Sequence, residues 1–281
     1  MKTLVTGAQG QLGRELVTRL VRGSVEAFTH ADLDVADGAA VAAAVRSARP
    51  DVVINASAYN KVDAAESDPA TALAVNASGV LHLARAAADV GALFVHVSTD
   101  YVFDGTASRP YIESHAPRPI NVYGVSKRAG EMMVEAVGAP SLVVRTSGVF
   151  GPGGSRSKGG SFVDRILERA RSGAPLRVVG DQVFSPTYAP DLAAAVVALV
   201  DRGARGLVHV ANEGACSWHE LAVAGLELGG VRADVERITT ADLAAVARRP
   251  VYSVLSTARY RELGGPPLRP WREAVAEMLR G

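Results

Sequence analysis

The stretch that most restricts the fold of this chain lies at its start. Residues 2–6 (Lys-Thr-Leu-Val-Thr) have the composition of a short strand, residues 7–13 read Gly-Ala-Gln-Gly-Gln-Leu-Gly, and an amphipathic helical pattern follows. Glycines between a strand and a helix permit a tight turn and let backbone approach a pyrophosphate at the helix N-terminus. The unit therefore predicts the dinucleotide-binding opening of an α/β sheet rather than a plain connector. Three residues would line the cofactor: Gly7, Gly10 and Gly13.

Strand-like and helix-like segments then alternate along most of the chain. Further strands are predicted at residues 25–29, 51–55, 93–97, 141–145, 176–179 and 206–210. Helices are predicted at residues 38–46, 68–90, 123–137, 162–171, 191–200, 218–228 and 240–247, and after residue 271. Strict alternation favours a doubly wound parallel sheet with helices on both faces. The predicted fold class is α/β, a Rossmann-type sheet with a smaller C-terminal α+β substrate-binding lobe.

The pattern also suggests a division into two parts. A dinucleotide-binding domain is predicted over residues 1–147, with residues 181–212 returning to it. Residues 148–180 and 213–281 would form the substrate-binding lobe. Residues 151–160 are rich in glycine and charge, which is typical of a loop over a site.

Composition excludes several classes of partner. The 281 residues carry a net charge of +1, which gives no electrostatic reason to expect nucleic acid or an anionic membrane. We find neither an apolar run long enough to span a bilayer nor a signal-peptide pattern. The single cysteine, Cys216, agrees with a reducing compartment, so we expect a cytoplasmic protein. The six histidines lack metal-ligand spacing and no metal site is predicted, while a homodimer remains open.

Two segments in the middle of the chain carry the chemistry. Ser98, Thr99 and Asp100 end the fourth predicted strand, and Tyr123 stands four residues before Lys127 at the start of a helix. Residues four apart share a helix face, so the ammonium should favour the phenolate and lower the tyrosine pKa toward neutrality. Together the segments predict a ketone reduction. A nicotinamide gives the hydride, Tyr123 gives the proton, and Thr99 or Ser98 bonds the ketone oxygen.

At this point the chain resembles a known family, the dTDP-4-dehydrorhamnose reductases of the extended short-chain dehydrogenase/reductase superfamily. The resemblance runs nearly end to end. The motifs that carry it include Ser-Thr-Asp-Tyr-Val-Phe-Asp-Gly at 98–105, Asn-Val-Tyr-Gly-x-Ser-Lys at 121–127, Arg-Thr-Ser at 145–147, Asp-Gln-x-x-Ser-Pro-Thr at 181–187 and Arg-Pro-x-x-Ser at 249–253. The Ser-Thr-Asp-Tyr-Val-Phe string and Arg-Pro-x-x-Ser are far more specific than the glycine turn. The resemblance implies NAD(P)H-dependent reduction of a nucleotide-linked 4-keto-6-deoxy sugar, above all dTDP-4-dehydrorhamnose in dTDP-L-rhamnose synthesis.

The resemblance also implies roles for individual residues. The catalytic trio would be Thr99, Tyr123 and Lys127. Besides the three glycines and the Tyr123–Lys127 pair, the cofactor would contact Gln11, Leu12, Asp34, Val35, Ala58, Tyr59, Asn60 and Val97. The nucleotide-sugar would contact Thr99, Asp100, Gly148 and Arg249.

Some positions depart from the family. Gly148 stands where the family usually has a tryptophan packed against the sugar, and Tyr59 replaces a common histidine. Losing an indole removes a large apolar contact, so sugar specificity should change first. Basic residues could neutralise the sugar diphosphate, and of Arg248, Arg249, Arg156 and Lys158 we back only Arg249.

The choice between NADPH and NADH stays open. The second predicted strand ends in Thr29 and His30, which are neither the acidic residue typical of NAD nor the basic one typical of NADP. Arg14 could meet a 2′-phosphate or be a solvated helix residue.

Two other functions are compatible with the same sequence. A nucleotide-sugar epimerase or dehydratase of the superfamily shares the fold and the Tyr–Lys pair but retains its NAD. A non-catalytic relative, such as the regulatory subunit of methionine adenosyltransferase, would bind a protein partner without turnover.

Overall fold

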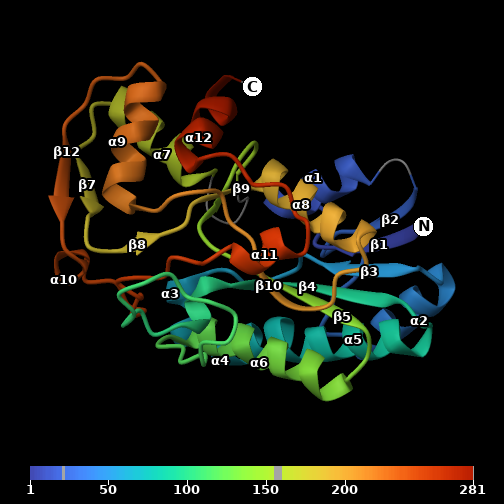
Figure 1. Cartoon of the computed structure of the whole chain (residues 1–281). Helices are drawn as coiled ribbons and strands as arrows, with labels where there is room; N and C mark the ends of the chain where they lie inside the picture. Colours follow the sequence, from blue (N-terminus) through green and yellow to red (C-terminus); the bar gives the residue numbers. More distant parts are fainter. Residues whose placement is uncertain (21–22, 155–159, 281) are drawn as a thin grey trace.

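The core of the molecule is a six-stranded parallel sheet, shown in Figure 1. The computed structural model describes residues 1–20, 23–154 and 160–280. The strands, in the sheet order β10-β5-β4-β3-β1-β2, are β10 (Gly206–His209), β5 (Ser141–Thr146), β4 (Leu93–Thr99), β3 (Val52–Asn55), β1 (Lys2–Thr6) and β2 (Ser24–Phe28). After β2 the chain crosses back over β1, so the order reverses between β1 and β3. Ligands of such sheets bind outside the carboxyl ends of the strands at this reversal.

Alternating side chains bury both faces of the sheet. In β3, Val53 belongs to one core cluster and Ile54 to the other, as the two-residue strand period requires. One face is covered by α1 (Gln11–Arg19) and α8 (Ala189–Asp201), and the opposite face by α2 (Gly38–Ala48), α5 (Gly79–Asp89) and α6 (Val122–Val137). Figure 1 shows α1 and α8 above the sheet and α2, α5 and α6 below it. The predicted doubly wound α/β sheet is confirmed.

The helix predicted over residues 68–90 contains a local irregularity. It consists of α4 (Pro69–Leu73), a π-helical turn at Ala74–Ser78, and α5. Asp68 caps its N-terminus and Pro69 fills the first turn, where a missing N–H costs nothing. A short helix not predicted from the sequence, α3 (Val62–Ser67), precedes it. Single π-helical turns are frequent at functional sites, and this one carries Asn76.

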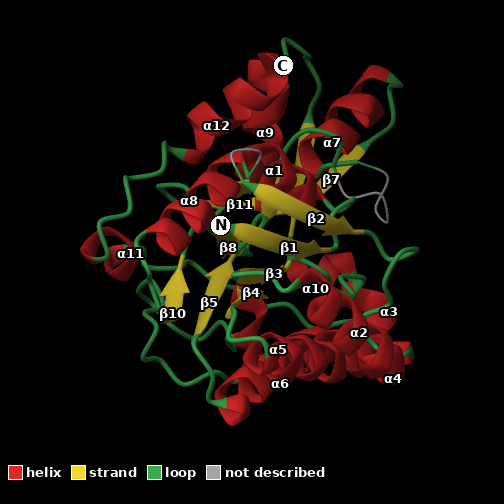
Figure 2. Ribbon diagram, turned by 90° about the vertical axis from the view of Figure 1, so that its right-hand side faces the viewer, coloured by secondary structure: helices red, strands yellow, loops and turns green. Residues whose placement is uncertain are grey.

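A second core lies beside the sheet. It joins α7 (Phe162–Arg171), α9 (Trp218–Leu228) and α12 (Trp271–Arg280) to the parallel strand pair β7 (Leu176–Val179) and β12 (Val235–Ile238). Figure 2 shows these helices apart from α5 and α6, beyond α1 and α8.

Short strands connect the second core to the sheet. They pair as β8 (Val183–Phe184) with β11 (Cys216–Ser217), and β6 (Val149–Phe150) with β9 (Thr187–Tyr188). Phe184 belongs to the second core, whereas Tyr260 of α11 (Ala258–Glu262) belongs to the first. The chain therefore passes between the cores more often than the predicted division at residues 147, 180 and 212 assumes, and that division stays a prediction.

One predicted element is shorter than expected. The helix predicted over residues 240–247 ends at Leu243 (α10, Thr240–Leu243), because Ala244 takes a left-handed conformation with φ 47°. Within the described ranges, we find no helix with the length and apolar character needed to cross a membrane.

Candidate active site

The carboxyl end of β4 and the first turns of α6 bring the predicted trio together. Thr99 ends β4, and Tyr123 and Lys127 lie on the side of α6 that faces it. The helix starts where Asn121 accepts the backbone N–H of Gly124 at 2.7 Å. Gly124 is required there, since a Cβ would lie 2.2 Å from the Tyr101 carbonyl oxygen. This close approach places the Tyr123 ring edge-on to Tyr101, with 5.8 Å between ring centroids.

Tyr123 is held as a neutral phenol. Burial raises its pKa to about 12, the hydrogen bond with the Thr99 hydroxyl opposes the shift, and the negative charge of Asp100 adds to it. The predicted lowering of the tyrosine pKa by Lys127 is therefore wrong for this arrangement. Burial of the phenol sets the direction of the shift, and Lys127 is not among the groups that lower the pKa of Tyr123. A phenol that keeps its proton at pH 7 is nevertheless the form that a proton donor needs.

The Lys127 ammonium is buried against β4. Its Nζ donates to the Val97 carbonyl at 2.7 Å and lies 3.4 Å from Nε2 of His96. Burial lowers the pKa of Lys127 to about 8, and the carboxylate of Glu131 opposes that shift. Lys127 thus titrates close to physiological pH.

The tautomer of His96 follows from its second neighbour. Asn55 accepts hydrogen bonds at Oδ1 from the Thr6 hydroxyl and the Ser57 N–H, which turns its amide nitrogen toward His96 Nδ1 at 3.3 Å. Nδ1 must then accept, which assigns the ring proton to Nε2, facing Lys127. Burial and the Lys127 charge lower the pKa of His96 well below its usual value, so the imidazole stays neutral beside the lysine.

Asp100 ties three parts of the chain together. Its Oδ1 accepts the Thr99 hydroxyl at 3.0 Å, and its Oδ2 accepts Ser147 at 2.7 Å and Ser253 at 2.6 Å. Burial raises the pKa of Asp100, while the three hydroxyls, led by Ser253, oppose the rise. Three converging donors suit an ionised carboxylate. Asp100 therefore fixes the Thr99 side chain and joins β4 to the C-terminal part of the chain.

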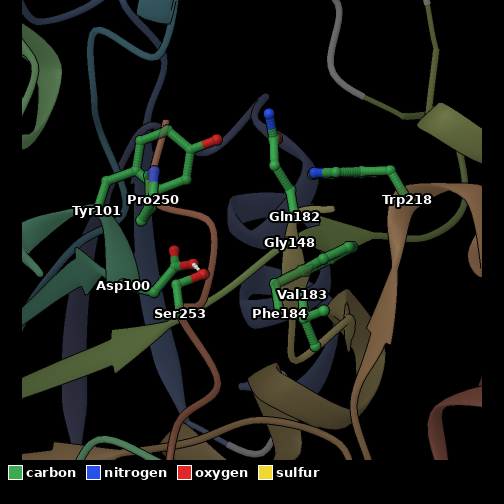
Figure 3. A pocket seen from close by; sticks show the side chains of 9 residues that line it. All are labelled: Asp100, Tyr101, Gly148, Gln182, Val183, Phe184, Trp218, Pro250 and Ser253. Carbon is green, nitrogen blue, oxygen red and sulfur yellow. Dashed lines mark hydrogen bonds between the residues drawn. The ribbon is translucent and has the colours of Figure 1, made fainter. Parts of the chain in front are cut away.

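A pocket opens next to this cluster (Figure 3). Its volume is about 250 Å³ when the open solvent at its mouth is included, and its lining includes the predicted substrate residues Asp100 and Gly148. Sequence reasoning missed the other lining residues, which are Tyr101, Gln182, Val183, Phe184, Trp218, Pro250 and Ser253. Most of them belong to motifs already quoted for the resemblance, so the motifs held the signal. Trp218 had none beyond its place at the start of a helix.

The glycine turn has the shape that a dinucleotide requires. Gly7 has φ +70°, and a Cβ there would lie 2.7 Å from the backbone of Ala56 at the end of β3. A Cβ on Gly13 would lie 2.1 Å from the Gly7 carbonyl oxygen, and the Gly10 N–H donates to that same oxygen at 2.8 Å. Side chains would fill this space, so the turn fits a pyrophosphate at the N-terminus of α1.

A second loop of predicted cofactor residues lies beside β3. Tyr59 is fixed through its backbone, because Asn76 accepts its N–H at 2.9 Å and donates to its carbonyl at 3.0 Å. Asn76 also donates to Ser126 of α6 at 2.9 Å. Ala58 is exposed and Asn60 is half-buried in the same loop. Asn76 is thus a further positioning residue, which the π-helical turn presents.

The remaining predicted cofactor residues have these positions. Asp34 is exposed and accepts the Ala36 N–H at 2.9 Å, and Val35 after it is buried. Leu12 packs on the first core. Gln11 donates to the Gly151 carbonyl at 3.2 Å, which ties α1 to the loop after β6.

Two of the basic residues considered as phosphate ligands form hydrogen bonds or ion pairs within the protein. Arg14 donates to the carbonyls of Pro152 and Gly154, each at 3.2 Å. Arg249 binds Asp63 through both terminal nitrogens, at 3.1 and 2.6 Å, and hydrogen-bonds Tyr101. Arg248 is exposed, and Arg156 and Lys158 lie outside the described residues. In the described ranges no three His, Cys, Asp or Glu side chains form a metal-binding group.

The whole chain, residues 1–281, matches the family described as RmlD substrate binding domain. The chain belongs to this family. It is 44% identical over 288 residues to the dTDP-4-dehydrorhamnose reductase of Mycobacterium tuberculosis, covering 99% of this chain and 92% of that protein. It is 41% identical to the spore coat polysaccharide biosynthesis protein SpsK of Bacillus subtilis, covering 99% and 97%. A solved structure of Bacillus anthracis dTDP-4-dehydrorhamnose reductase in complex with NADP superposes with a TM-score of 0.95 at 34% identity, covering 99% and 98%. The family predicted from the sequence motifs is confirmed.

Proposed function

We propose that this protein is a nicotinamide-dependent oxidoreductase that reduces the 4-keto group of a dTDP-linked 6-deoxy sugar, as a dTDP-4-dehydrorhamnose reductase. One observation carries the proposal: a neutral, buried Tyr123 is hydrogen-bonded to Thr99, whose hydroxyl is bound by the pocket residue Asp100, in a sheet that opens with a glycine turn shaped for a pyrophosphate. Three relatives at 41–44% identity, all named dTDP-4-dehydrorhamnose reductase, support the same substrate. The structural relative with bound NADP supports the cofactor class.

The proposed division of labour follows from the hydrogen bonds. Bound NADPH or NADH supplies the hydride. Tyr123 donates its proton to the ketone oxygen as that oxygen gains charge. The Thr99 hydroxyl contacts both the Asp100 carboxylate and the Tyr123 phenol, so Thr99 positions the phenol beside the ketone. Lys127, when charged, binds the cofactor ribose and stabilises the developing phenolate.

The other roles read from the sequence form part of the same proposal. Gly7, Gly10 and Gly13 receive the pyrophosphate, and the 58–60 loop flanks the cofactor. Arg249, paired with Asp63, carries its charge near Tyr101 at the pocket, where it supports the sugar diphosphate. A cytoplasmic location is proposed from the reducing cofactor and from a single cysteine, Cys216, which is buried and free. A homodimer stays a prediction for sedimentation analysis.

A substrate panel tests the proposal. dTDP- and UDP-4-keto-6-deoxy sugars are assayed with NADH and NADPH in parallel, following oxidation of the cofactor at 340 nm. We expect stoichiometric oxidation with the dTDP-linked 4-keto sugar. Copurifying NAD that does not exchange would favour an epimerase or dehydratase instead. Capture of a protein partner with no turnover on any keto sugar would favour a regulatory subunit.

A further inference from the structure

One wall of the pocket is built from stacked aromatic rings. Trp218 stacks on Phe184 with ring centroids 4.1 Å apart and an interplanar angle of 25°, and it meets Phe162 edge-on at 4.8 Å. Its backbone is fixed as well, since Ser217 and Glu220 form a reciprocal capping box at the start of α9. The indole is therefore held by two aromatic rings and a fixed backbone before any ligand binds.

Phe184 occupies the space above Gly148. A Cβ on Gly148 would lie 2.1 Å from Cε2 of the Phe184 ring, and Gly148 has φ +50°, which also favours glycine. The ring is 3% exposed, so it fills this corner of the pocket and supports the indole from behind. The apolar surface at this corner thus comes from Phe184 on β8 and not from residue 148.

The free edge of Trp218 points into the pocket. Figure 3 shows its indole nitrogen directed across the pocket, toward the side that holds Gln182 and Tyr101. The side chain is half-buried, and nothing in the described part of the chain accepts its N–H. An indole N–H can only donate. The wall therefore offers an apolar ring edge and one hydrogen-bond donor.

The opposite wall has a different chemistry. It presents the Asp100 carboxylate and the Tyr101 side chain, both next to Thr99. A pocket with one aromatic wall and one polar wall suits a pyranose, since C–H groups pack on aromatic carbon while hydroxyls meet polar groups. A 6-deoxy sugar has an additional apolar group, its methyl, for such a wall.

We propose that Trp218, supported by Phe184, is the sugar-contacting and specificity-determining wall of this enzyme. The indole packs against the apolar side of the 6-deoxy pyranose and donates its N–H to a sugar oxygen. This inference rests on the proposed function, because it assigns that function's substrate to this pocket.

The second tryptophan of the chain supplies a matched control. Trp271 begins α12 and does not line the pocket. Trp218→Phe keeps an aromatic ring for the stack and loses the N–H, whereas Trp218→Ala loses the ring too. We expect the KM for the dTDP-4-keto sugar to rise about tenfold in the first variant and roughly a hundredfold in the second. The Kd for NADPH should stay unchanged, and Trp271→Phe should leave both constants unchanged.

A binding titration makes the test independent of turnover. In Trp271→Phe the only indole is Trp218, and its fluorescence should change as dTDP-L-rhamnose is added. In Trp218→Phe the remaining indole should not respond. If Trp218→Ala fails to fold, the KM of Trp218→Phe and this titration still test whether Trp218 contacts the sugar. Two results would contradict the role of Trp218. One is an active wild-type enzyme whose KM for the keto sugar is unchanged in Trp218→Phe. The other is Trp218 fluorescence that does not change when the nucleotide-sugar is added. A wild-type protein that binds dTDP-L-rhamnose through Trp218 but reduces no keto sugar instead overturns the proposed function alone.

Discussion

A buried ion pair beneath the site allows a sharp test of what holds the catalytic helix on the sheet. Glu131 of α6 accepts Nε and Nη2 of Arg145 at 2.8 and 2.7 Å, and the Ser98 hydroxyl at 2.6 Å. The Glu131 and Arg145 side chains are 2% and 1% exposed. Arg128 joins the cluster from the surface side at 3.1 Å. The pair therefore links the helix of Tyr123 to both strands that end at the site.

Glu131→Gln should be strongly destabilising. It leaves the Arg145 guanidinium buried without a counter-charge, and removing one partner of a buried pair costs about 3–5 kcal/mol. At about 2–4 °C per kcal/mol, the midpoint of thermal unfolding should fall by roughly 10 °C. Glu135→Gln is the matched control: the same substitution on the same helix, with the same partner Arg128, but on a carboxylate that is 63% exposed. It should cost less than about 0.5 kcal/mol.

The difference in unfolding free energy between wild type and Glu131→Gln should depend on pH in a defined direction. Burial raises the pKa of Glu131, but Arg145 and Ser98 outweigh burial, so the pKa lies below its usual value of 4.5. A carboxylate with a lowered folded-state pKa stabilises the protein above its unfolded pKa and loses that contribution as pH falls through the folded pKa. The gap between wild type and Glu131→Gln in urea unfolding should be constant from pH 6 to 8 and shrink below about pH 4. Equal stability of the Glu131 and Glu135 variants at pH 7 would refute the reasoning.

Three further predictions concern the site. In Gly13→Ala the new Cβ would lie 2.1 Å from the Gly7 oxygen, so NADPH binding measured by fluorescence should weaken at least tenfold, and unchanged affinity would contradict the assigned turn. In Gly148→Ala the methyl group meets Phe184 at 2.1 Å, so the KM for the keto sugar should rise severalfold while NADPH binding stays constant. The pKa of Lys127 is lowered to about 8, so its charge is present below and lost above that pH. The kcat/KM should accordingly fall about tenfold per pH unit on the alkaline side, and a profile flat to pH 10 would exclude Lys127 as the titrating group.

Local sequence patterns were sufficient for the sheet and its helices. The strands are short apolar runs bounded by turn residues. The glycines that permit the tight turn all lie within seven residues of one another. Both features can therefore be predicted without tertiary information. The positioning role of Asn76 was not predicted, because it depends on a π-helical turn that places its amide between Tyr59 and Ser126. Local periodicity does not reveal such a turn.

The site was predicted unevenly for a similar reason. Thr99, Tyr123 and Lys127 lie in two compact motifs, and the structure brings them together as expected. The tyrosine pKa was predicted in the wrong direction, because helix spacing places a cation on the same helix face but does not show the burial that raises the pKa of the phenol. Phe184 and Trp218 come from two separate segments of the sequence, and only the folded chain shows that they form one wall.

The central claim is that Tyr123 delivers the proton to the ketone oxygen. Tyr123→Phe keeps the ring against Tyr101 and removes only the hydroxyl. The direct measurement is kcat for oxidation of NADPH by the dTDP-4-keto sugar, with the Kd for NADPH determined on the same protein. We predict that kcat falls at least about a hundredfold in the variant while the Kd stays within twofold of wild type. A variant that reduces the ketone at the wild-type rate would contradict the mechanism.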